Sequence, residues 1–168
     1  MKKILTLLVT LGLIFGGMKS AAAGNTANQT VTFEVSKIYE IGVSGNPGTF
    51  ILSSLSQDPE VLAPASDSST TYNITFNGPA LIFAELLSEM PPSTSFYVRL
   101  DPPSGGTSYG EKALNDFAQG FPLSPQRLVY IDKYAVDINK TITYRLEATI
   151  WAGVGSGTNT VRFTIGGL

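Results

Sequence analysis

The chain has 168 residues, a formal net charge of −2 and only 14% charged residues, and it contains neither His nor Cys. These absences exclude His-based acid–base catalysis, Ser-His-Asp and Cys-His nucleophiles, ordinary zinc sites and disulfides. The weakly acidic, low-charge composition argues against nucleic acid and anionic membranes as partners.

The first residues have the pattern of a secretory signal peptide. Lys2 and Lys3 precede an apolar run over residues 4–17, and small residues follow at 20–23. The apolar run is shorter than the roughly 20 residues that span a bilayer. We therefore expect cleavage after Ala23 and no membrane span after cleavage. Residues 24–168 should form a single exported domain, secreted or held in a bacterial cell envelope.

An unusually long strand pattern begins at Gln29. A continuous strand over residues 29–43 would span roughly 50 Å, against about 17–20 Å for an ordinary strand. We therefore expect a bend near Lys37, where the chain either crosses to a second sheet or projects past the body of the domain. Apolar residues of one phase carry this pattern: Val31, Phe33, Val35, Tyr39, Ile41 and Val43.

Turn residues and short strands follow in alternation. A turn at 44–48 precedes a predicted short strand at 49–52, and a loop rich in Pro, Ser and Asp covers 57–69. Residues 70–76 alternate again, with Tyr72, Ile74 and Phe76 on one face, and stop at Asn77-Gly78-Pro79. This pattern predicts a strand.

Residues 80–90 favour two structures. The Ala, Leu and Glu content and Pro79 suit a helix, whereas Ile82, Ala84 and Leu86 recur with a period of two. We predict a strand that closes a hairpin with residues 70–76, with a helix as the alternative. Further strands are expected around 96–100, 112–117 and 128–134.

Residues 141–165 show the clearest alternation in the chain. Ile142, Tyr144 and Leu146 share one face with Ala148 and Ile150, and after a glycine-rich turn at 152–157 the pattern resumes as Val161, Phe163 and Ile165. This predicts an antiparallel β-hairpin with one buried face. With the upstream strands it indicates an all-β fold, an antiparallel β-sandwich of immunoglobulin-like type with about 7–9 strands, or alternatively a closed barrel.

Several stretches of the chain have a familiar sequence: Asn-Gln-Thr-Val-Thr-Phe-Glu-Val at 28–35, Glu-Ile-Gly-Val-Ser-Gly at 40–45, Pro-Ser-Gly-Gly-Thr-Ser at 103–108 and Val-Arg-Phe-Thr-Ile at 161–165. With these stretches the chain resembles a group of small exported, cysteine-poor, immunoglobulin-like β-sandwich proteins of bacterial envelopes. The resemblance implies a β-sandwich of the envelope without an assigned activity. These are strand and turn residues, and they form no site motif.

Few residues could carry chemistry. The acidic residues stand singly on the solvent phases of strands or in loops, so we predict solvated charges and no enzyme. Residues 58–67 and 132–137 offer oxygen ligands but lack the dense spacing of a calcium loop, so neither a metal ion nor another cofactor is expected.

Exposed aromatic residues are the better indication of a contact surface, since aromatic rings bind sugars and protein partners. The alternative is that they pack against the end of the sandwich. The candidates are Trp151, Tyr97, Tyr109, Phe117 and Phe121.

Two non-catalytic functions fit these features. The first is a structural or adhesive protein of the cell surface or extracellular matrix, which binds copies of itself or other envelope proteins. In the self-assembling version, Val31, Phe33 and Val35 form an exchanged strand that pairs with a neighbouring subunit. The alternative is that this strand folds back onto its own sheet, bends at Lys37 and leaves the protein monomeric. The alternative function is a secreted carbohydrate-binding module with polysaccharide as its partner.

Overall fold

The computed structural model describes residues 29–115 and 124–168. The predicted signal peptide, Phe117 and Phe121 lie outside these residues. The chain divides into two units, Met1–Glu34 and Val35–Leu168, and every strand that is described belongs to the second unit.

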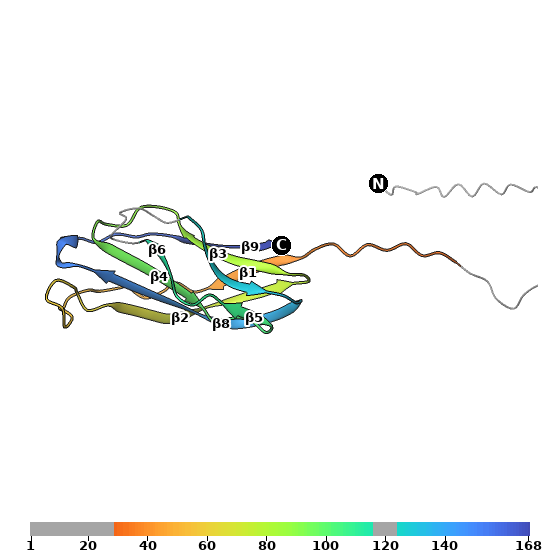
Figure 1. Cartoon of the computed structure of the whole chain (residues 1–168), viewed down its shortest axis with the longest axis horizontal. Helices are drawn as coiled ribbons and strands as arrows, with labels where there is room; N and C mark the ends of the chain where they lie inside the picture. The colour runs from red at the N-terminus through yellow and green to blue at the C-terminus, as the bar shows by residue number, and fades with distance from the viewer. Residues whose placement is uncertain (1–28, 116–123) are drawn as a thin grey trace, which may run out of the picture. The chain divides into compact units, whose positions relative to one another are not determined.

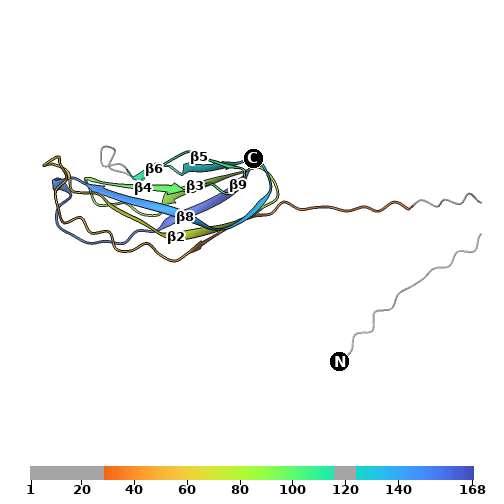
Figure 2. The same ribbon diagram turned by 90° about the horizontal axis from the view of Figure 1, so that it is seen from below.

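In the described residues, nine strands form two antiparallel sheets, which pack as a β-sandwich (Figures 1 and 2). The first sheet has the strand order β1 (Tyr39–Ser44), β2 (Ala65–Phe76), β8 (Ala135–Ala148), β4 (Thr94–Leu100) and β6 (Lys112–Asn115). The second sheet has the order β5 (Gly106–Ser108), β7 (Gln126–Ile131), β3 (Ala80–Leu86) and β9 (Val161–Gly167). The predicted all-β sandwich and its strand number are confirmed.

The core lies between the two sheets, where the inward phase of each strand meets that of the opposite sheet. Phe96 of β4 stacks on Tyr144 of β8 at 5.9 Å between ring centroids, and Phe50 meets Phe96 edge-on at the same distance. The largest fully buried apolar side chains are Tyr72, Ile74, Ile82, Leu100, Leu114, Leu128, Ile131, Ile142, Val98 and Val129. This pattern is what period-2 alternation dictates when one face of each sheet is buried.

The predicted hairpin over residues 141–165 is wrong. Its two strands exist, but β8 belongs to the first sheet and β9 to the second (Figure 1). β8 already pairs with β2 on one side and β4 on the other, so it has no free edge for β9. The chain therefore crosses between the sheets through residues 149–160, which include a short 3₁₀ helix, Ile150–Ala152.

The strand predicted within residues 80–90 is confirmed as β3. Its predicted hairpin with residues 70–76 is wrong for a similar reason. β2 is flanked by β1 and β8, and the Asn77–Pro79 turn carries the chain to the other sheet, where β3 pairs with β7 and β9. A short turn between two strands that are consecutive in the sequence can therefore connect the two sheets, and not only two paired strands of one sheet.

Strand boundaries differ from the predictions in the loop regions. Residues 49–52 form no strand, whereas β2 begins at Ala65, within the predicted loop, and β5 was not expected. Residues 45–64 and 149–160 meet at one end of the sandwich (Figure 1), where Leu62 N donates to Ala148 O at 2.9 Å and Val61 bridges Thr149.

Candidate functional site

A groove of about 650 Å³ opens between the edges of the two sheets. β1 is the edge strand of the first sheet, and β9 is an edge strand of the second. Both strands and the adjacent part of β2 line the groove, through Tyr39, Glu40, Ile41, Gly42, Asn73, Ile74, Thr75, Phe163, Thr164 and Ile165. Two neighbouring strand edges thus border one solvent-open concavity.

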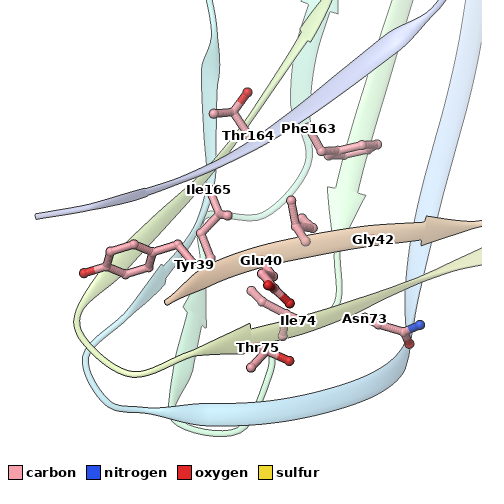
Figure 3. Close-up of a pocket in the computed structure, with 10 residues that line it drawn as sticks. Tyr39, Glu40, Gly42, Asn73, Ile74, Thr75, Phe163, Thr164 and Ile165 are labelled. Atoms are coloured by element: carbon pink, nitrogen blue, oxygen red, sulfur yellow. The ribbon is translucent and has the colours of Figure 1, made fainter. Parts of the chain in front are cut away.

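The apolar side chains of β9 face into this groove. Figure 3 shows Phe163 and Ile165 on the side of β9 toward β1, with Thr164 on the opposite side. Val161, Phe163 and Ile165 pack against the core but are only partly buried. The prediction that Phe163 lies on the inward face of its strand is therefore correct. Its side chain is only partly buried, because no strand covers the outer edge of β9 in the described part of the chain.

Tyr39 closes one end of the groove. A Cβ atom placed on Gly167 would lie 2.6 Å from the Tyr39 hydroxyl oxygen, so the ring packs directly over the glycine backbone. The same hydroxyl donates to Pro79 O at 3.3 Å. The absence of a side chain at Gly167 allows this close approach. Phe163 to Ile165 line the open part of the groove.

Asn77 holds the chain just before β1. Its side-chain Nδ2 donates to Ser36 O at 2.8 Å, and its Oδ1 accepts from Ile38 N at 2.8 Å. Asn77 N also donates to Ile38 O at 3.2 Å. These bonds extend the contact between β1 and β2 by a few residues and fix the backbone at Ser36.

The residues that precede this clamp carry the predicted assembly strand. Residues 29–38 form no strand in the structure, so only Tyr39–Ser44 of the long predicted run is a strand. Val31, Phe33 and Val35 are 74%, 83% and 77% exposed. Three apolar side chains of one phase are thus exposed immediately before an anchored position.

Comparison with known proteins gives no identification: no protein-family model matches the chain, and neither a curated protein nor a solved structure is similar to it. The proposal for the function of this protein therefore rests on the residues of the site.

Tyr97 does not form a free aromatic surface. The Arg145 guanidinium carbon lies 4.1 Å from the centroid of its ring. Arg145 also pairs with Glu111 at 2.5 Å and with Glu147. The hydrogen bond to Glu111 is the main cause of the raised pKa of Arg145. Tyr97 was expected to be an exposed aromatic residue, but the Arg145 guanidinium covers its ring.

The other described aromatic candidates lie on separate elements. Trp151 belongs to the 3₁₀ helix and is 72% exposed, with its backbone N–H bonded to Thr149 Oγ1. Tyr109 follows β5, is 43% exposed, and donates its backbone N–H to Leu128 O. Of the predicted aromatics, Trp151 is the most exposed in the described part of the chain.

The described titratable groups show structural roles. Burial raises the pKa of the Tyr72 hydroxyl, and the carboxylates of Asp101 and Asp137 raise it further. The backbone N–H of Ser69 lowers the pKa of Asp67, assisted by the Ser69 hydroxyl.

Within residues 29–115 and 124–168, no three potential metal-ligating side chains of His, Cys, Asp or Glu gather into one group. No helix in these ranges has the length and apolar character needed to cross a membrane.

Sequence reasoning singled out residues 31–35 as a possible assembly segment but did not identify the groove. Phe163 and Ile165 carry the same alternation as fully buried strands, and nothing local marks β9 as an edge strand. The one available signal was that the run over residues 29–43 is too long for a single strand.

Proposed function

We propose that this protein is a non-catalytic structural or adhesive component of the bacterial cell surface or extracellular matrix, which assembles with copies of itself by strand exchange. The observation that carries the proposal is the exposed alternation of Val31, Phe33 and Val35 in a chain whose sandwich has an open groove between two edge strands.

The physical basis is the chemistry of strand edges. An edge strand presents unpaired backbone N–H and C=O groups, which bind an added strand through main-chain hydrogen bonds. Each large apolar side chain transferred from water to an apolar site contributes roughly 1.5–3 kcal/mol. Residues 31–35 offer three such side chains on one face and polar side chains on the other.

Assembly of this kind suits an exported protein without disulfides. The N-terminal residues have the pattern of a secretory signal, and the sequence contains no Cys. Strand exchange joins subunits without a covalent bond. Because the donor segment and the acceptor groove are different surfaces, repeated addition gives an open filament unless its rotation closes a ring.

The test compares two double variants of the chain that begins at Gly24. V31D/F33D places charges on the apolar phase and should abolish oligomers in light scattering and filaments in negative-stain microscopy. T30D/T32D adds the same charge on the opposite phase and should still assemble. Wild-type protein that stays monomeric at high concentration, with unchanged melting of both variants, would contradict the proposal.

Trp151 supports a second candidate function, binding of carbohydrate. Its indole is exposed at the end of the sandwich where residues 45–64 and 149–160 meet. Exposed aromatic rings stack on the apolar faces of sugars. Trp151→Ala should then abolish retention on polysaccharide while the melting temperature stays unchanged, and the absence of wild-type binding across a glycan array would remove this candidate.

A further inference from the structure

We infer that the acceptor is the free edge of β9, and that residues 31–35 of a second copy pair with it antiparallel, Val31 opposite Ile165 and Val35 opposite Val161. This inference rests on the proposed strand exchange and specifies where and in which direction the strand binds.

The side chains match position by position in this register. Phe33 lies opposite Phe163, so the apolar phases of both strands face the groove. Directly opposite residues of an antiparallel pair point to the same face and contact each other. Tyr39 packs over Gly167 at one end of β9, and the part of β9 that lines the groove is Phe163 to Ile165.

Charge favours the antiparallel direction over the parallel one. The antiparallel register places Glu34 opposite Arg162, whose guanidinium is exposed and already bonded to Glu85 at 2.7–2.8 Å. Neither parallel register of the same phase does so: Glu34 lies opposite Thr164 when Phe33 faces Phe163, and opposite Gly166, at the end of the groove that Glu40 lines, when Thr32 faces Thr164. Opposite charges across a strand pair stabilise it, whereas nearby like charges destabilise it.

The clamp at Asn77 requires that the strand come from another copy. Leu168 N donates to Pro79 O, so the turn that holds Ser36 lies at the Gly167 end of β9. Val161 is six residues further along β9, about 20 Å at 3.3 Å per residue. Val35 is one residue from Ser36, about 3.8 Å between Cα atoms. A chain therefore cannot place its own Val35 opposite its own Val161 while the clamp is in place.

Introduced cysteines test this arrangement cleanly, because the sequence has no Cys of its own. Opposite residues in an antiparallel pair have Cα atoms about 4.5–5.5 Å apart, which suits a disulfide. The double variant E34C/R162C, oxidised after assembly, should give a ladder of disulfide-linked multimers on a non-reducing gel. The three cysteine positions that distinguish the two strand directions should accept the substitution. Glu34 and Arg162 are exposed, and a Cβ on Gly166 meets nothing within 4 Å.

Three companion variants identify the edge and the direction. T32C/T164C should also give a ladder, because these positions are opposite in the antiparallel register and in the parallel register that places Glu34 opposite Gly166. E34C/G166C should stay uncrosslinked, since it reports that parallel register. T32C/T107C should stay uncrosslinked as well, because Thr107 is on β5 at the other edge of the same sheet.

Each outcome decides a different point. A ladder from E34C/G166C instead of E34C/R162C, or a bond within one chain, overturns the antiparallel exchange. Oligomers in light scattering with a ladder only from T32C/T107C overturn the assignment to β9 and leave strand exchange intact. Wild-type protein that does not assemble removes this inference together with the proposed function.

Discussion

Tyr72 combines complete burial with a polar group that needs a partner. Its side chain is fully buried on β2, and its hydroxyl donates to Asp101 O at 2.5 Å. Burial disfavours the phenolate, and so do the carboxylates of Asp101 and Asp137. The folded protein therefore holds the pKa of this hydroxyl above the value of about 10 that an unfolded chain would have.

The first prediction concerns alkaline stability. Because the pKa of Tyr72 is raised in the folded protein, the contribution of Tyr72 to the free energy of unfolding is complete below about pH 10. This contribution is lost as the pH rises above that value. Tyr72→Phe should cost about 1 kcal/mol at pH 8, through loss of the hydrogen bond. Urea unfolding at pH 8 and above pH 10 should show a smaller alkaline loss for Tyr72→Phe than for wild type. Equal losses would mean that other groups cause the alkaline sensitivity.

Arg145 shows how the outward face of a strand can still be structured. Its phase predicts a solvated charge whose removal costs under about 0.5 kcal/mol. The structure instead places the guanidinium over the Tyr97 ring and against Glu111 and Glu147. The contacts come from β4, from the residue before β6 and from β8 itself, so only the folded sheet brings them together.

The second prediction follows from these contacts. Arg145→Ala should reduce the free energy of unfolding by about 1 kcal/mol, since a surface cation–π contact and an ion pair each contribute several tenths or more. Arg99→Ala is the control, because Arg99 pairs with Asp101 at 3.5 Å with both side chains about half exposed. The control should cost under about 0.5 kcal/mol. Equal values from chemical denaturation would show that the ring contact contributes nothing.

At the scale of elements, position in the sheet decides how much each strand contributes. β3 lies between β7 and β9 and is largely buried, whereas β9 has one paired edge and partly exposed side chains. Ile82 of β3 and Ile165 of β9 are direct partners in the ladder. They have the same side chain in central and edge strands.

The third prediction uses this pair. Ile82→Ala should cost about 2–5 kcal/mol, because Ile82 is fully buried and a cavity would remain. Ile165→Ala should cost less than half as much in the monomer, since water already reaches its side chain. Both values come from urea unfolding of dilute protein. A larger loss at Ile165 would show that β9 is covered in solution.

At the scale of the whole molecule, titration is confined to the ends of the pH range. The sequence has no His and no Cys, so no side chain has an unperturbed pKa between about 5 and 8. At the acid end, Asp67 accepts hydrogen bonds from Ser69 N at 2.9 Å and Gly48 N at 3.1 Å. These bonds hold the pKa of Asp67 below its ordinary value.

The fourth prediction is the resulting pH profile. The melting temperature should be nearly flat from about pH 5 to 8 and unaffected by reductant. Because the pKa of Asp67 is lowered in the folded protein, the contribution of Asp67 to the free energy of unfolding is present above about pH 4. This contribution is lost as the pH falls further. Asp67→Asn should therefore melt lower than wild type at pH 6, with a smaller difference at pH 3. A step of several degrees between pH 5 and 8 would reveal a strongly shifted carboxylate.

The fold class and most strands follow from local alternation. Residues 70–76, 80–86 and 96–100 each place apolar side chains at every second position, and a strand is the backbone that puts these on one face. The alternation of Val31, Phe33 and Val35 is equally clear in the sequence, whereas their exposure is a result of the structure. The immunoglobulin-like subtype, export and assembly stay predictions.

The partition of strands between sheets depends on long-range pairing. Alternation states which face of β8 and β9 is apolar, but each strand has two edges whose backbone groups are the same for every sequence. Whether a sequence neighbour or a distant strand pairs with an edge depends on how all the strands pack together. Both edges of β8 are paired, with β2 and β4, so β9 joins the other sheet and leaves its own edge beside β1. The groove exists for that reason, and no stretch of the chain encodes it locally.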